Sequence, residues 1–283
     1  MRTISYQVCD VFTDRPLTGN ALAVFTDANG LDDATMQALA REMNLSESAF
    51  VLRTTVRDAD ARIRIFTPTM ELPFAGHPTL GSAFVLTDPV QEEAVIRIET
   101  KRAVVTVRLS RAGTAVGFGW MTQPLPLRES FAVTDELLGA LGVEKSGLPI
   151  ALYDNGPRYV LVELEAAAQV AALRPDLGRL VGLGSLAFMV FARDGDGWKS
   201  RVFAPGKGIP EDPATGAAAG PLAVHLAYYG RTQFGDEVVI RQGAEIGRPS
   251  TLHARAVGSS ERLERVEVGG NAVVVARGEF RLP

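Results

Sequence analysis

The sequence predicts an α+β fold made of two pseudo-symmetric domains, each a curled, mainly antiparallel β-sheet around one central helix of small residues. Three observations predict it. Short runs of alternating or β-branched residues, which are typical of strands, outnumber the helical segments in the 283-residue sequence. Two segments, 78–86 and 213–229, are dense in Gly and Ala. A long internal repeat connects these two segments to similar strands.

The predicted strands share an alternation of period two, as in Ile63-Arg64-Ile65, where apolar residues flank an arginine. They are expected at residues 4–12, 22–25, 49–52, 63–66, 95–99, 104–109, 116–120, 150–153, 159–163, 186–192, 199–203, 238–241, 251–257, 262–268 and 272–280. Helical signals are fewer. Asp32 is the predicted N-cap of a helix whose apolar residues recur at helical spacing, and shorter helices are expected at 134–142 and 165–173.

The two helices of small residues have a common start. Each is predicted to begin with proline at its first position, with His77 at the cap of one and Asp212 at the cap of the other. A helix with so little side chain fits where backbone comes close on all sides. We therefore expect each helix at the centre of a sheet that curls around it.

The internal repeat comprises a strand, a loop and the start of a helix. The matched segments are 64–68 with 201–205, both reading Arg-x-Phe-x-Pro, then 72–73 with 209–210, and 77–81 with 212–216. Six residue identities in one order favour two related domains. We place the first at residues 1–122 and the second at 123–283, because residues 123–126 form a proline-rich bridge. The last strand could return to the first domain.

Composition narrows the function classes. A net charge of −4 without a basic run argues against nucleic-acid binding, which usually needs a positive footprint. The first residues lack the pattern of a signal peptide, and no apolar run approaches the roughly 20 residues that span a bilayer. Cys9 is the only cysteine, so an internal disulfide is excluded. We therefore expect a cytoplasmic protein with no nucleic-acid or membrane partner.

The two predicted helix N-termini suggest a site that binds an anion. A helix N-terminus attracts anions, because its first backbone N–H groups are unpaired and its dipole is positive there. The repeat predicts that two such ends face each other across a cleft. They would hold a substrate carboxylate or a developing enolate without a metal, which suits proton removal next to a carboxylate. The reaction also needs an acid and a base within reach of the reacting carbons.

Four polar residues are candidates for this chemistry, and each has a structural alternative. His77 and Asp212 stand at the predicted helix ends, but Asp before Pro is also typical of an ordinary N-cap, and His77 fits a tight turn. Glu47 follows the first helix, where local sequence alone favours a solvated turn residue. Asn20 could bind a ligand or only shape its turn.

No metal site or cofactor is expected. The three histidines, His77, His225 and His253, are scattered along the sequence. The sequence also lacks a Walker loop, a His-Glu-x-x-His motif and a Gly-x-Ser-x-Gly motif.

Several segments together resemble one known family, the PhzF-like (phenazine biosynthesis F-type) isomerases. They appear in family order and cover most of the chain: Asp10-Val-Phe-Thr-Asp-Arg-Pro-Leu-Thr-Gly-Asn20, Asn44-Leu-Ser-Glu47, Arg64-Ile-Phe-Thr-Pro68, Ala75-Gly-His77-Pro-Thr-Leu-Gly81 and Glu211-Asp212-Pro-Ala-Thr-Gly216. The resemblance implies the diaminopimelate-epimerase-like fold and a homodimer. It also implies a cofactor-independent isomerase that shifts a proton on a small unsaturated carboxylate, as in isomerisation of trans-2,3-dihydro-3-hydroxyanthranilate.

The resemblance also implies residue roles. The acid/base glutamate falls on Glu47, and further catalytic residues fall on His77 and Asp212. The substrate-binding positions are Asn20, Gly76, Thr215, Gly216 and Ala217. Many relatives have Ser where this chain has Ala217, so the hydroxyl contact is lost and the substrate could differ. Related epimerases use two cysteines at the helix ends, which this chain, with one cysteine, cannot do.

Two alternatives remain open at this point. The chain could isomerise or epimerise another small acid on the same fold. It could also bind a small ligand without catalysis, which would give binding without deuterium exchange.

Overall fold

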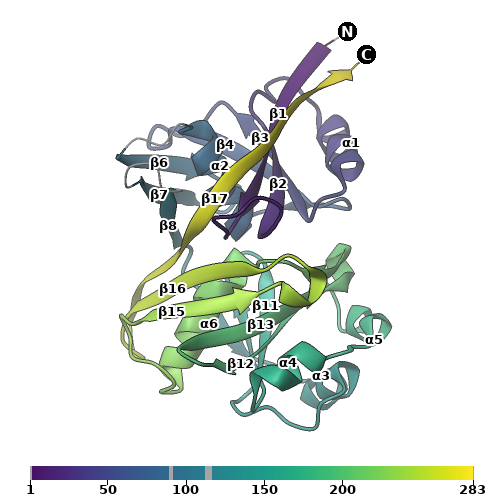
Figure 1. Ribbon diagram of the computed structural model, residues 1–283, viewed down its shortest axis with the longest axis vertical. Helices are drawn as coiled ribbons and strands as arrows, with labels where there is room; N and C mark the ends of the chain where they lie inside the picture. Colours follow the sequence, from purple (N-terminus) through teal and green to yellow (C-terminus); the bar gives the residue numbers. More distant parts are fainter. Residues whose placement is uncertain (1, 89–91, 112–116, 283) are drawn as a thin grey trace.

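The computed structural model describes residues 2–88, 92–111 and 117–282 (Figure 1). The protein is rich in strands and has few helices. Within the described ranges, seventeen strands join through hydrogen bonds into one continuous sheet. None of the helices there combines the length and the hydropathy that a bilayer-spanning helix requires. The predicted strand at 116–120 starts outside the described residues, and its remainder forms the start of β8.

The strands of the first half of the chain curl around helix α2 (Gly76–Leu86), which contacts β1 to β4 and β6 to β8 (Figure 1). These elements are β1 (Arg2–Val11), β2 (Asn20–Phe25), α1 (Asp33–Met43), β3 (Glu47–Leu52), β4 (Ala61–Phe66), β5 (Glu71–Leu72), β6 (Glu93–Glu99), β7 (Val104–Ser110) and β8 (Phe118–Gln123). Asp32 is confirmed as the N-cap of α1, since its Oδ1 accepts from the backbone N–H of Thr35 at 2.8 Å.

The second half of the chain places helix α6 (Gly216–Tyr228) against β11 and β16 in the same manner. Its elements are β9 (Leu127–Ser130), α3 (Thr134–Leu141), β10 (Ala151–Asp154), β11 (Arg158–Glu163), α4 (Ala167–Ala172), α5 (Leu177–Gly182), β12 (Ala187–Asp194), β13 (Gly197–Ala204), the 3₁₀ turn η1 (Pro205–Lys207), β14 (Ile209–Asp212), β15 (Glu237–Gln242), the 3₁₀ turn η2 (Ala244–Ile246) and β16 (Ser250–Gly258). The sequence did not predict α5, β9 or β14.

The last strand, β17 (Leu263–Leu282), joins the two groups of strands. Its first residues pair with β16 and β8, and its second part pairs with β1 along that strand's whole length. In Figure 1 it rises from the strands around α6 to those around α2, and the two chain ends lie together. The sequence predicted two strands here, at 262–268 and 272–280, where the structure has one.

Strand pairing repeats between the two halves. The pairs β2–β3 and β11–β12 are parallel, as are β4–β6 and β13–β15. The pairs β3–β4 and β12–β13 are antiparallel, and a short antiparallel strand follows each, β5 after β4 and β14 after β13. A buried helix comes next in both, α2 and α6. The repeat read from the sequence therefore corresponds to a repeated order of ladders.

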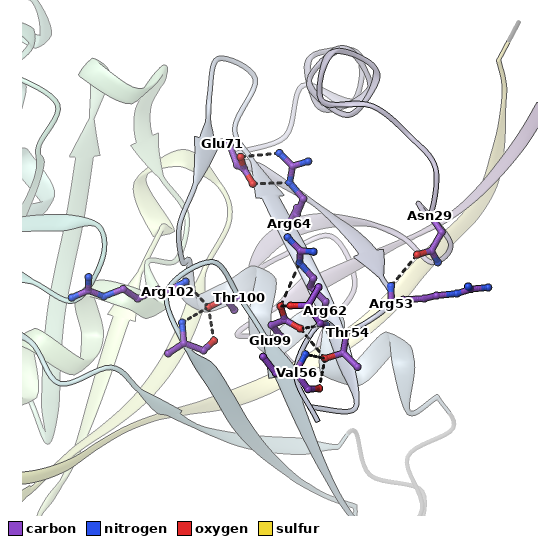
Figure 2. A network of polar contacts seen from close by, with 12 residues as sticks. Asn29, Arg53, Thr54, Val56, Arg62, Arg64, Glu71, Glu99, Thr100 and Arg102 are labelled. Carbon is purple, nitrogen blue, oxygen red and sulfur yellow. Dashed lines mark hydrogen bonds and ion pairs between the residues drawn. The ribbon is translucent and has the colours of Figure 1, made fainter. Parts of the chain in front are cut away.

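Side chains of the repeat make the same contacts twice. Arg64 on β4 forms a two-bond ion pair with Glu71 on β5, with N–O distances of 2.8 and 2.9 Å (Figure 2). Arg201 on β13 pairs likewise with Glu211 on β14, at 2.8 and 2.7 Å. Both guanidinium groups also lie about 5 Å from the ring of the repeat's phenylalanine. These contacts explain why the motif is Arg-x-Phe.

Small residues in the two helices allow close approach of the strands. A methyl group added at Gly81 in α2 would lie 2.7 Å from side-chain atoms of Leu22 and Val11. One added at Gly220 in α6 would lie 2.3 Å from Gln123. Nearly every residue of both helices is buried, as expected for a helix apolar on all sides.

Candidate active site

The first residues of α2 and α6 meet. A Cβ atom added to Gly76 would lie 2.4 Å from the backbone N of Ala217 and 2.6 Å from the backbone C of Gly216. Such distances are below any normal contact, so only glycine allows the backbones to come this close. Neither helix has a side-chain hydrogen bond at its N-cap. Two positive helix ends are thus joined with backbone N–H groups left for an anion.

The start of α2 differs slightly from the prediction. The helix begins at Gly76, the N-cap is Ala75, and His77 is the second helical residue. Pro78 takes the third position, where its missing N–H removes no helical hydrogen bond. His77 therefore lies within the first turn, with its ring buried, and does not cap the helix.

The start of α6 corrects the prediction more clearly. The sequence placed Pro213 at the first helical position, but the helix begins three residues later at Gly216, with Thr215 as N-cap. Asp212 ends β14 instead, because a residue before proline favours extended backbone. Its carboxylate accepts from the Thr215 hydroxyl and is not a helix cap.

Asp212 is the centre of a buried hydrogen-bond network. Its Oδ1 accepts from Nδ2 of Asn20 at 2.8 Å, and its Oδ2 accepts from Oγ1 of Thr215 at 2.5 Å. Nδ2 of Asn20 also donates to the carbonyl of Ala214 at 2.9 Å. Gln242 donates to the carbonyl of Asp212 and to Oγ1 of Thr215. The network links β2 to the start of α6 and fixes the Asp212 carboxylate.

Asn20 is placed by the loop that precedes it. Asp10 accepts from the backbone N–H of Leu17 at 2.7 Å and pairs with Arg248 at 2.6 Å. Arg248 also donates to the carbonyl of Gly19, whose φ of +67° favours glycine. These contacts explain the Asp and Gly of the first family motif.

Glu47, at the start of β3, lies beside His77. Its Oε2 is 3.5 Å from Nδ1 of His77, and this oxygen has no hydrogen-bond partner among the described residues. Nδ1 of His77 also lies 3.3 Å from Nδ2 of Asn20. Glu47 is 7% exposed. A buried carboxyl without its own donor is available to a ligand.

Burial governs the protonation of this cluster. It raises the pKa of Glu47 well above its usual value, and the charge of Asp212 adds to this while Lys207 opposes it. Burial also raises the pKa of Asp212 to about 6, although hydrogen bonds from Thr215 and Asn20 lower it. The pKa of His77 falls to about 3 through burial, so the ring is neutral. Two carboxyls in different environments can exchange a proton with a substrate at neutral pH.

A small cavity of about 30 Å³ lies at the helix ends and has room for about two water molecules. Its polar lining comprises Glu47, Tyr159, Lys207, Asp212 and Thr215. Its apolar lining comprises Leu72, Ala75, Pro157, Ala187, Val202, Ala204 and Ile209. This mixture suits a small ring with polar substituents.

The structure brings most of the predicted site residues together. Glu47, Asp212 and Thr215 line the cavity. Asn20 donates to the Asp212 carboxylate, and His77 lies beside the Glu47 carboxyl. Gly76 and Gly216 form the joined helix ends.

Ala217 does not line the cavity. It is buried in the core, and its carbonyl accepts from Nδ2 of Asn155 at 2.9 Å. No group of three or more His, Cys, Asp or Glu side chains in the described parts of the chain is arranged to hold a metal ion.

Sequence reasoning missed two polar cavity residues, Lys207 and Tyr159. Lys207 ends the η1 turn, and its Nζ lies 5.5 Å from the ring centroid of Tyr159 on β11. Burial lowers the pKa of Lys207 to about 8 and raises that of Tyr159. A lysine between two glycines looks like a solvated turn, so no local signal identified it.

Comparison with known proteins shows the family of the chain. The family described as phenazine biosynthesis-like protein (PhzC-PhzF) matches residues 9–278. The chain belongs to this family. A trans-2,3-dihydro-3-hydroxyanthranilate isomerase of Pseudomonas aeruginosa is 49% identical over 277 residues, which cover 98% of this chain and 99% of that protein.

Solved structures share the fold. A PhzF-family phenazine biosynthesis protein of Bacillus anthracis is 28% identical, has a TM-score of 0.86 and matches 100% of both chains. A hydroxyproline epimerase of Agrobacterium vitis has a TM-score of 0.70 at 15% identity, covering 98% of this chain and 92% of its own. The second likeness concerns the fold alone.

Proposed function

We propose that this protein is an isomerase of trans-2,3-dihydro-3-hydroxyanthranilate and that Glu47 carries the migrating proton. The observation that carries the proposal is the buried Glu47 carboxyl, which has an oxygen without a hydrogen-bond partner among the described residues and faces a cavity at two joined helix ends. The isomerase of P. aeruginosa, 49% identical along almost the whole chain, supports the choice of substrate.

The geometry suggests how the proton moves. The substrate carboxylate binds the free N–H groups at the starts of α2 and α6. The Glu47 carboxylate takes the proton from the ring carbon that bears the hydroxyl, and the electrons of the broken C–H bond move through the conjugated ring towards the carboxylate. The helix ends stabilise this charge. Protonated Glu47 then returns the proton to another ring carbon, so the product is an isomer.

Asp212 completes the proposed site. Hydrogen bonds from Asn20 and Thr215 hold the Asp212 carboxylate and favour its ionised form while Glu47 exchanges protons. Its charge makes Glu47 a stronger base. The chain itself supplies the proton carrier and the groups that stabilise charge, so we propose that the reaction needs no cofactor.

We propose that the chain forms two pseudo-symmetric domains, residues 1–122 and 123–283, with the second part of β17 added to the first. The repeated ladder order and the duplicated Arg–Glu pairs support this division. The cavity of about 30 Å³ is smaller than the substituted ring. Substrate therefore enters when the two domains separate, and their closure excludes water.

The test measures solvent deuterium incorporation by NMR during turnover of trans-2,3-dihydro-3-hydroxyanthranilate in heavy water. Glu47→Gln is expected to lower turnover by about 10²- to 10⁴-fold, the usual contribution of a general acid/base. Glu165→Gln is the matched control, because Glu165 is exposed and forms an ion pair with the exposed Lys145. Wild-type turnover and deuterium exchange in Glu47→Gln would refute the role of Glu47.

The homodimer implied by the family resemblance and the cytoplasmic location expected from the sequence remain part of this proposal. Light scattering of the purified protein tests the first, and cell fractionation tests the second.

A further inference from the structure

Lys207 is held in the site by contacts from both halves of the chain. It ends η1, and Gly208 follows with a φ of +80°, which turns the chain into β14. Oγ1 of Thr69, in the turn between β4 and β5, donates to the carbonyl of Lys207 at 3.2 Å. The backbone is therefore fixed, and the side chain lines the same cavity as Glu47 and Asp212.

The ammonium group of Lys207 has no ion pair within 4.0 Å and no hydrogen bond to the described part of the chain, although the residue is only 8% exposed. The other three lysines of the sequence each pair with a carboxylate: Lys101 with Glu71, Lys145 with Glu165, and Lys199 with Glu245. A buried charge is costly unless it is paired. Nζ of Lys207 lies over the ring of Tyr159, 5.5 Å from its centroid. An ammonium that has this ring contact but no hydrogen-bond acceptor, and that faces a cavity, points to an acceptor that comes with a ligand.

The surroundings indicate which part of a ligand this would be. The joined helix ends already provide for a carboxylate. The ammonium lies more than 4.0 Å from every described carboxylate oxygen, including those of Glu47 and Asp212, which leaves room for a ligand atom between them. Apart from the two carboxyls, the other polar groups of the lining are the hydroxyls of Tyr159 and Thr215. A second oxygen on the ligand would find its strongest donor in Lys207.

We propose that Lys207 determines specificity: its ammonium donates a hydrogen bond to the ring hydroxyl of the substrate, so the site selects ring carboxylates that carry an oxygen substituent. This inference rests on the proposed function of the same site. It differs from that function because it concerns recognition of the ring oxygen and not transfer of the proton.

Two unreactive probes test it by calorimetry, anthranilate and 3-hydroxyanthranilate, which differ only in the ring hydroxyl. Wild type is expected to bind the hydroxylated probe about 10- to 100-fold more tightly, as for a hydrogen bond to a charged group. Lys207→Met should bind both about equally, because the ring hydroxyl loses its donor. Lys145→Met removes an exposed, paired lysine and should keep the wild-type preference.

The outcomes separate this inference from the proposed function. A preference lost in Lys207→Met supports the inference even if the wild type does not turn over the dihydro substrate. A preference retained in Lys207→Met, or absent in wild type, overturns it. Lys207→Gln, which keeps polarity without charge, is measured in parallel and should show an intermediate preference. Should the Met variant fail to fold, the Gln variant decides, and an unchanged preference there also overturns the inference.

Discussion

The contact between the two helix ends predicts the effect of a single methyl group. In Gly76→Ala the new Cβ would lie 2.4 Å from the backbone N of Ala217, whereas ordinary contact begins near 3.4 Å. The obstacle is backbone, so no side chain can rotate away, and the ends must separate by about 1 Å. A displacement of this size can lower a rate about 10²-fold. Overpacking should also cost about 1–3 kcal/mol of stability.

Turnover and thermal unfolding distinguish these effects. We expect kcat of Gly76→Ala to fall about 100-fold at a temperature where the variant is folded, and Tm to fall by about 2–4 °C for each kcal/mol lost. Gly182→Ala is the matched control, because a Cβ at the end of α5 meets nothing within 4 Å and φ there is not positive. If Gly76→Ala kept wild-type kcat, the joined helix ends could not be the anion site.

Two further predictions concern charge. Burial lowers the pKa of Lys207 from 10.5 to about 8, which corresponds to about 3 kcal/mol. The unfolded chain keeps this proton to a higher pH than the folded chain does. The loss of folding stability is therefore complete below pH 8 and disappears as the pH rises from 8 to 10.5. Chemical denaturation should therefore find Lys207→Met more stable at pH 7, with the gain disappearing near pH 10.5; a loss at pH 7 would contradict this. Asn20→Ala removes a donor to Asp212, so the pKa of Asp212 should rise above about 6, as measured by carboxyl NMR titration.

The repeat made much of the fold predictable. The Arg-x-Phe-x-Pro motif predicts a strand from neighbouring residues alone. Its second occurrence predicts that the two halves of the chain are related. The start of α6 was harder to predict from the sequence, because Asp-Pro fits both a helix cap and the end of a strand. Packing of β14 against β13, through the pair of Arg201 and Glu211, selects the strand.

The site residues were also difficult to predict from local sequence. Local sequence favoured a solvated turn for Glu47, and only the family resemblance assigned it a role. The structure buries it because β3 pairs with β2 and β4 on both sides, which are long-range contacts. Lys207 lies between two glycines, and its burial depends on a turn more than a hundred residues earlier in the chain. Neither environment can be read from neighbouring residues.

The groups of this site are individually unfavourable for folding. Glu47 is buried with an oxygen that no described residue hydrogen-bonds, and Lys207 is a largely buried residue whose ammonium has no ion pair among the described residues. Replacing such groups with neutral or apolar ones of similar size often stabilises a protein. The surrounding structure offsets the cost: Gln123 donates to the carbonyl of Gly216, and Asn155 to that of Ala217, which holds the start of α6 in place. Variants of Glu47 or Lys207 should therefore lose function while keeping or gaining stability. Variants of Gln123 or Asn155 should lose both function and stability.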